Sequence, residues 1–201
     1  MIGCAGAGCI GKTTFSQQFR EVIGESQCQL IGLDGYLMER KRRIQLGQIS
    51  GYNPLGFELC KARKEISELI LFKKTFSLPI YNRITQTREL SEQIYFKEII
   101  LIEGGLALTS HFHWLEDLHI FFNSDATTQY QLRLRREKFE FGYSEQEVKK
   151  RFDIYYHDYQ KFIAPQIYSS DIILHVKTDQ PLEISKNNHC ISPKPLQKNC
   201  S

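Results

Sequence analysis

One glycine-rich segment near the start of the chain restricts its fold more than any other feature. Residues 6–13 fit the pattern G-x-x-x-x-G-K-[ST] at every fixed position. Apolar residues 1–5 predict a short strand before it, and residues 13–23 predict an amphipathic helix after it. Glycines allow such a turn to direct backbone N–H groups at a phosphate, and a helix presents its positive N-terminal end to the same anion. The segment therefore predicts a strand–turn–helix unit that binds the phosphates of a nucleotide.

Several side chains of this phosphate loop have an expected role. The Lys12 ammonium would reach the β- and γ-phosphates, the Thr13 hydroxyl would bind Mg²⁺, and Thr14 would lie near the α-phosphate. ATP and Mg²⁺ are the expected cofactors, because the sequence lacks the N-K-x-D pattern that reads guanine in GTPases. The predicted nucleotide-binding residues are Gly6, Ala7, Gly8, Cys9, Ile10, Gly11, Lys12, Thr13 and Thr14.

Apolar runs of strand length alternate with helical patterns along most of the chain. Continuous apolar runs suit parallel strands that are buried on both faces. Strands that alternate with helices imply a sheet with helices on both sides. The predicted fold is therefore α/β, a P-loop NTPase three-layer sandwich with a mostly parallel sheet flanked by helices. The further strands are expected at residues 29–33, 99–102, 118–122 and 171–176, and the further helices at residues 57–72, 125–138 and 144–162.

Local signals predict the ends of some elements. Ser124 is the expected N-terminal cap of the helix that follows it, and residues 144–147 resemble a capping box. Residues 34–56 are polar and contain glycine, which predicts a loop with a short helix. Residues 178–201 are polar and lack periodicity, so we expect a disordered tail after a single domain at residues 1–177.

Composition disfavours several classes of protein. The chain has 201 residues, enough for one buried core, and its net charge of +3 is too small to indicate nucleic-acid binding. No apolar run reaches the ~18 residues that a membrane span needs, and the first residues do not resemble a signal peptide. The six cysteines form no CxxC pair, so we expect free thiols in a reducing cytoplasm.

Two carboxylates follow predicted strands. Asp34 and Glu103 each end an apolar run, and the carboxyl ends of parallel strands face the ligand crevice. Asp34 can accept the proton of an attacking hydroxyl, and Glu103 can hold Mg²⁺ through water. His111, His113 and Trp114 lie close together in the sequence, but their spacing predicts no second metal-ligand set. We expect these three to be surface or packing residues.

Several motifs occur in an order that resembles a known family. Residues 2–173 are similar to the uridine kinase, phosphoribulokinase and bacterial pantothenate kinase group of P-loop kinases, and closest to the uridine kinase branch. The resemblance implies a small helical lid and transfer of the γ-phosphate of ATP to a hydroxyl of a small molecule. Besides the phosphate loop, it rests on residues 34–37 (DGYL), 81–88 (YNRITQTR), 102–104 (IEG), 133–137 (RLRRE), 140–142 (EFG), 162–165 (FIAP) and 171–173 (DII).

The resemblance also implies roles for single residues. Asp34 would be the base beside the catalytic Lys12, and Arg133 and Arg136 would neutralise charge on the transferred group. The expected acceptor is the 5′-hydroxyl of a pyrimidine nucleoside, uridine or cytidine, and a homo-oligomer is plausible. The implied metal ligands are Thr13 and Glu103, and the implied substrate-binding residues are Asp34, Tyr36, Asn53, Tyr81, Gln86, Arg88 and Arg133.

Three positions depart from the pattern of nucleoside kinases. Asn53 replaces the aspartate that holds the ribose, Gln86 replaces a base-reading histidine, and Phe141 replaces the lid arginine. Arg151 is one candidate to substitute for that arginine, and residues 34–37 are closer to the pantothenate branch. Two alternatives therefore stay open. The chain is either a kinase of another small hydroxyl metabolite, such as pantothenate, a sugar phosphate or glycerate, or a nucleotide-binding regulator without catalysis.

Overall fold

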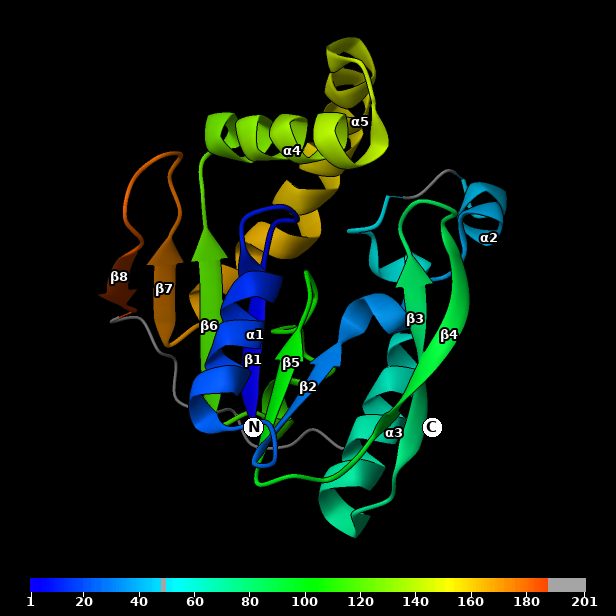
Figure 1. Ribbon diagram of the computed structural model, residues 1–201, viewed down its shortest axis with the longest axis vertical. Coiled ribbons are helices and arrows are strands. Elements are labelled where there is room, and N and C mark those ends of the chain that lie inside the picture. Colours follow the sequence, from blue (N-terminus) through cyan, green and yellow to red (C-terminus); the bar gives the residue numbers. More distant parts are fainter. Residues whose placement is uncertain (48–49, 188–201) are drawn as a thin grey trace.

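The computed structural model describes residues 1–47 and 50–187. Its centre is a six-stranded sheet (Figure 1), in which β8 pairs antiparallel with β7 and the other neighbours pair parallel. The strands lie in the order β2 (Cys28–Gly32), β5 (Ile99–Glu103), β1 (Ile2–Gly6), β6 (Leu118–Asn123), β7 (Ile172–His175) and β8 (Glu183–Lys186). The predicted α/β class with a mostly parallel sheet is confirmed.

Helices flank this sheet and cover one of its ends. The α-helices are α1 (Lys12–Ile23), α2 (Arg40–Gln45), α3 (Leu59–Phe72), α4 (Ala126–Phe141) and α5 (Glu145–Asp158). Short helical turns are η1 (Leu33–Tyr36), η2 (Pro54–Gly56), η3 (His113–Leu115), η4 (Tyr159–Ile163) and η5 (Ala164–Ser169). In Figure 1, α1 passes in front of the sheet, and α4 and α5 lie above the carboxyl ends of its central strands. The expected lid, at about residues 136–144, corresponds to the end of α4 and the turn between these two helices.

The central strands are buried because helices cover both faces of the sheet. Leu101 and Ile102 of β5 and Phe121 of β6 have no exposed surface. From α1, Phe15 packs edge-to-face on Phe122 of β6, with ring centroids 5.3 Å apart. Strands packed in this way hold the loops at their carboxyl ends in fixed positions.

A two-stranded hairpin beside α3 is the main element that the sequence did not predict (Figure 1). β3 (Phe76–Asn82) and β4 (Thr87–Ile94) pair antiparallel, with an irregular register after Pro79. The strand pattern is weak because Pro79 interrupts it and most of β4 is exposed. Leu78 and Ile94 are buried in the core and anchor the hairpin.

Two helix ends differ from the expectation. The N-terminal cap of α4 is Asp125, whose side chain accepts a hydrogen bond from the Thr128 N–H, so Ser124 is not the cap. Helix α5 ends at Asp158 and continues as the π-helical turn η4, whereas one helix was expected up to residue 162. The capping box at the start of α5 is confirmed, with Ser144 and Glu147 as its members.

The expected disordered tail contains a strand. Residues 183–186 form β8, which extends the sheet beyond β7. The His175 ring and the Ser185 hydroxyl form a 2.9 Å hydrogen bond between the two strands, so polar side chains support a strand that the apolar pattern does not reveal. Residues 188–201 of the expected tail lie outside the described residues.

Two other expectations concern the membrane and the thiols. Among the described residues, no helix is both long enough and apolar enough to cross a membrane. Four cysteines of the described segments carry free thiols, namely Cys4, Cys9, Cys28 and Cys60. The expectation of free thiols is confirmed for these four.

Candidate active site

The phosphate loop connects β1 to α1 at the carboxyl edge of the sheet. Gly6 and Gly11 have φ angles of 142° and 91°. A Cβ on Gly6 would lie 2.5 Å from the carbonyl oxygen of Phe122, so this position requires glycine. Gly11 precedes α1 without a side-chain cap. The first N–H groups of the helix are therefore available to an anion, as the sequence pattern predicted.

Lys12 lies beneath this loop and is 6% exposed. Its ammonium donates a 2.6 Å hydrogen bond to the Ala7 carbonyl oxygen and lies 4.0 Å from Oε1 of Glu103. Burial lowers the pKa of Lys12, and the carboxylates of Glu103 and Asp34 act in the opposite direction. A positive charge is thus held where the phosphates of a nucleotide are expected.

Thr13 and Glu103 bring two oxygen-bearing side chains together. The Thr13 hydroxyl, in the first turn of α1, donates a 3.1 Å hydrogen bond to Oε2 of Glu103, the last residue of β5. Burial raises the pKa of Glu103, while the nearby Lys12 ammonium lowers it. Hydroxyl and carboxylate oxygens are the ligands that Mg²⁺ prefers. The two predicted metal ligands therefore fit a magnesium ion.

Asp34 lies in η1, directly after β2, and lines the same cleft as Lys12 and Glu103. Its Oδ2 atom forms an ion pair with Arg83, from the turn between β3 and β4. Its position inside the cleft would raise the pKa of Asp34, but the charges of Arg83 and Lys12 outweigh this and hold the pKa below its usual value. Asp34 is therefore ionised at neutral pH, as a proton acceptor must be.

The cleft continues from Asp34 toward α4 and α5. Tyr81 and Gln86, from the β3–β4 hairpin, and Arg133 and Arg136, from α4, line it. The Nε atom of Arg136 lies 2.9 Å from each carboxylate oxygen of Glu140, one helical turn away. The fold thus brings these four predicted residues to the cleft that contains Lys12 and Asp34.

Tyr52 contacts the phosphate loop, and sequence reasoning missed it. Its hydroxyl accepts a hydrogen bond from the Gly8 N–H and a second one, of 3.0 Å, from Arg133. Arg133 is buried, pairs with Glu137 at 2.9 Å and lies 4.3 Å from the centre of the Tyr155 ring. Arg133 therefore supports the phosphate loop through Tyr52. No local pattern signals this, because the contact joins residues far apart in the sequence.

Further arginines line the cleft. Arg43, from α2, donates a 2.9 Å hydrogen bond to the Tyr81 hydroxyl. Arg151, from α5, lies 3.6 Å from Glu137. Sequence reasoning named Arg151 as a substitute for the missing lid arginine, and it lines the cleft together with Phe141. Sequence reasoning gave no role in the site to Arg43 or to Arg83, which pairs with Asp34.

Two predicted substrate residues do not line the cleft. Tyr36 is 1% exposed, and its hydroxyl donates a 2.9 Å hydrogen bond to Glu65 of α3. Asn53 caps η2, where its Oδ1 atom accepts a 3.1 Å hydrogen bond from the Leu55 N–H. Both side chains are occupied in local structure, so the expectation that they bind the acceptor is corrected.

Arg88 is a third predicted substrate residue that lies elsewhere. Its guanidinium donates a 2.7 Å hydrogen bond to Glu58 and a 2.9 Å hydrogen bond to the Leu37 carbonyl oxygen. It is absent from the residues that line the cleft. Arg88 ties the hairpin to the segment before α3, and we do not assign it a contact with the acceptor.

A glycine loop, a buried lysine and a threonine–carboxylate pair at the carboxyl edge of a parallel sheet define a P-loop nucleotide-binding protein. The model of the family described as "Phosphoribulokinase / Uridine kinase family" matches residues 1–183. The chain therefore belongs to the phosphoribulokinase / uridine kinase family. The resemblance to this family is confirmed, and the uridine kinase branch stays a prediction.

Individual relatives are distant. To a phosphoribulokinase of Synechocystis sp., the chain is 22% identical over 200 residues. The aligned region covers 98% of this chain but only 59% of that protein. It is 29% identical over 181 residues to a uridine kinase of Halobacterium salinarum, covering 86% of this chain and 78% of that protein. The solved phosphoribulokinase of Rhodobacter spheroides has a TM-score of 0.67 at 18% identity, covering 87% of this chain and 69% of that one. This last likeness shows the fold.

Proposed function

We propose that this protein is a kinase that uses ATP and Mg²⁺ to phosphorylate a hydroxyl group of a small molecule. The observation that carries the proposal is the convergence of Lys12, Asp34 and the Thr13–Glu103 pair in one cleft. A cation for the phosphates, oxygen ligands for a metal and an ionised carboxylate are the groups that phosphoryl transfer requires. Family membership supports the same reaction.

Each group has its own part in this proposal. The loop amides and Lys12 would bind the phosphates. Thr13 and Glu103 would hold Mg²⁺, which supplies positive charge to the phosphate oxygens when bound. Because Arg83 holds Oδ2 of Asp34, the other oxygen of this carboxylate would accept the proton of the attacking hydroxyl. Arg136 would stabilise the charge of the transferred group.

The charge of the acceptor region favours an anionic acceptor. Arg43, Arg83 and Arg151 line the cleft, and Arg40 lines an adjoining pocket that also contains Arg43 and Arg151. Guanidinium groups bind phosphate and carboxylate groups strongly, whereas an uncharged nucleoside offers neither. A sugar phosphate is therefore our first candidate, and pantothenate and glycerate, which carry a carboxylate, follow. A relative named phosphoribulokinase agrees with this order.

A pyrimidine nucleoside, the acceptor that the sequence favoured, is the second candidate. Tyr81, Tyr155 and Gln86 line the cleft together. Aromatic rings can stack on a base, and a side-chain amide can hydrogen-bond to its edge. The relative named uridine kinase supports this candidate.

Release of ADP from Mg-ATP in the presence of single acceptors tests the proposal. The panel contains a pentose phosphate, glycerate, pantothenate, uridine and cytidine. We expect turnover with at least one of them. Asp34→Asn should lower kcat by about 100-fold or more while nucleotide binding persists, because only proton transfer is lost. Lys12→Ala should abolish binding of Mg-ATP. If Asp34→Asn turned over at the wild-type rate, a different base would replace Asp34. If no acceptor gave turnover while Mg-ATP still bound, a nucleotide-binding regulator would replace our assignment.

A pair of variants on α5 separates the two acceptor classes. Arg151→Gln should raise KM for an anionic acceptor by about tenfold, the effect of losing one charge-assisted hydrogen bond. KM for ATP should stay the same. Lys150→Gln is the matched control, because Lys150 is the exposed neighbour and does not line the cleft. Turnover of uridine that is unaffected by Arg151→Gln would favour the nucleoside.

A further inference from the structure

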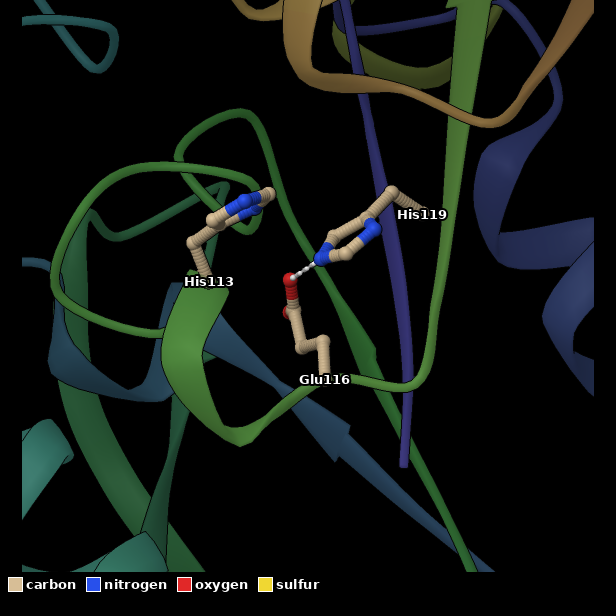
Figure 2. Close-up of side chains that lie close together, drawn as sticks. All are labelled: His113, Glu116 and His119. Atoms are coloured by element: carbon tan, nitrogen blue, oxygen red, sulfur yellow. Dashed lines mark ion pairs between the residues drawn. The ribbon is translucent and has the colours of Figure 1, made fainter. Parts of the chain in front are cut away.

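Two histidines and a glutamate meet at the end of the sheet opposite the phosphate loop. His113 begins η3, Glu116 follows this turn, and His119 is the second residue of β6. His119 pairs with Gly3 of β1, whereas the phosphate loop begins at the other end of that strand. Figure 2 shows the two imidazole rings facing one another, with the Glu116 carboxylate directed at His119. The sequence spacing of the histidines alone did not predict this cluster.

The candidate ligand atoms are close together. One nitrogen from each ring and one carboxylate oxygen all lie within 4.8 Å of one another. Nε2 of His119 is 3.4 Å from Oε2 of Glu116, and the ring centroids of His113 and His119 are 4.2 Å apart. Ligands around a tetrahedral zinc ion are about 3.3 Å apart, as follows from Zn–N distances of about 2.0 Å. Side-chain rotations that turn the two stacked rings away from each other would bring the ligand atoms to the tetrahedral spacing.

Four polar atoms of this cluster are buried without a hydrogen-bond partner. They are Nδ1 of His113, both carboxylate oxygens of Glu116 and Nε2 of His119. Two of them, Nε2 of His119 and Oε2 of Glu116, make only the 3.4 Å contact with each other. The Glu116 side chain has no exposed surface. A buried polar atom is nearly always paired in a native protein, so four unpaired atoms in one place indicate a missing partner. A cation at the centre would supply a partner to the side chains of all three residues.

The surroundings of the cluster also fit a ligand. A Cβ on Gly3 would lie 2.2 Å from Oε1 of Glu116, so the missing side chain makes room for this carboxylate against β1. Oδ2 of Asp171 lies 2.8 Å from Nδ1 of His119 and accepts a 2.8 Å hydrogen bond from its backbone N–H. A carboxylate at Nδ1 fixes the tautomer whose Nε2 lone pair faces the cluster.

We propose that His113, Glu116 and His119 bind a divalent transition-metal ion of the Zn²⁺ type. Two imidazoles and one carboxylate are ligands that suit zinc, whereas magnesium prefers oxygen ligands alone. The ion would link η3 to β6 and so hold the connection between β5 and β6 in place. A water molecule would occupy the fourth coordination position. This site is separate from the Thr13–Glu103 pair, because the two lie at opposite ends of the sheet.

A proton is the competing occupant. Burial raises the pKa of Glu116 to about 9, and a neutral carboxyl could donate a hydrogen bond to His119. A proton would pair Glu116 with His119 alone, whereas the metal would also take His113 as a ligand. The experiment therefore centres on His113, which is partly exposed.

The test compares metal binding by the full chain and its variants. After treatment with a chelator, each protein is titrated with Zn²⁺ in competition with a chromophoric chelator, and with Co²⁺ followed by visible absorption. We expect the wild type to bind one equivalent more than His113→Gln or Glu116→Gln, or to bind it at least tenfold more tightly. Asp171→Asn, which loses only the positioning carboxylate, should weaken binding by about 10–100-fold. His111→Gln is the matched control, because His111 lies outside the cluster.

Zinc can also bind free thiols, so the cobalt spectrum is decisive. Bands of a nitrogen- and oxygen-ligated ion, without a thiolate charge-transfer band, should appear in the wild type and in His111→Gln. They should disappear in His113→Gln, whose fold is checked by circular dichroism. Equal stoichiometry, affinity and spectra for the wild type and His113→Gln would overturn the proposal and leave the shared proton as the occupant. Should His113→Gln fail to fold, the wild-type cobalt spectrum alone decides.

Discussion

The ion pair between Arg83 and Asp34 determines the pH at which the proposed base carries its charge. Inside the cleft, the Asp34 carboxylate faces the positive groups of Arg83, Lys12 and Arg136, and its pKa lies below the usual value as a result. A low pKa keeps the carboxylate ionised over a wide pH range. It also makes the carboxylate a weaker proton acceptor. Arg83 therefore lowers the basicity of Asp34 and raises the fraction of Asp34 that is ionised.

Removal of Arg83 should therefore change the pH profile. In Arg83→Gln, the pKa of Asp34 should rise, so the acidic limb of kcat/KM should move to higher pH, since the base must lose its proton to act. The measurement is kcat/KM across the acidic range with the acceptor that the panel identifies. Arg42→Gln is the control, because Arg42 is exposed and does not line the cleft. An acidic limb that stays in place in Arg83→Gln would show that another group titrates.

At the scale of single elements, the sequence predicted those strands that a short-range apolar pattern marks. The buried strands β1, β5 and β6 were predicted almost to the residue, because a short continuous apolar run is typical of a strand buried on both faces. The hairpin β3–β4 was missed because Pro79 and an exposed, polar β4 remove the usual strand signal. Strand β8 was missed because its pairing with β7 depends on a neighbour rather than on its own sequence.

The cap of α4 offers a test of local helix energetics. Oδ1 of Asp125 accepts a 2.7 Å hydrogen bond from the Thr128 N–H. Asp125→Ala should therefore lower the free energy of unfolding by about 1 kcal/mol. Ser124→Ala should be neutral or slightly stabilising, because the Ser124 hydroxyl is buried without a partner. Urea unfolding measures both. If Ser124→Ala lowered the free energy of unfolding more than Asp125→Ala, Ser124 would be the cap.

At the scale of the whole molecule, residues of α4 and α5 line the cleft, and the expected lid, at about residues 136–144, connects these helices. Arg136 faces the cleft and pairs with Glu140 of its own helix, and Phe139 is 91% exposed. We expect residues 136–144 to exchange backbone hydrogen quickly in the free protein and more slowly when a non-hydrolysable ATP analogue and Mg²⁺ are bound, because the lid then closes over the nucleotide. Hydrogen exchange with mass spectrometry measures this. Exchange in α3, which does not line the cleft, is the internal control, and an unchanged rate at residues 136–144 would contradict lid closure.

Some residues of the candidate site could be predicted from the sequence, and others could not. The phosphate loop, Asp34 and Glu103 could be placed from sequence because each follows directly from a strand end. Tyr52, Arg83 and the cluster around Glu116 could not, because tertiary contacts between distant segments create them. The homo-oligomer and the cytoplasmic location stay predictions.

Strand β8 has a consequence for any shortened version of the chain. A protein that ended at residue 177, the domain limit suggested by the sequence, would expose the backbone N–H and C=O groups of one side of β7. The side chains of β7 include Ile172, Ile173 and Leu174, and an open apolar edge of this kind recruits strands from other copies into aggregates. The short β8 pairs with that edge and has the charged residues Glu183 and Lys186 at its ends, a feature that disfavours the addition of further strands.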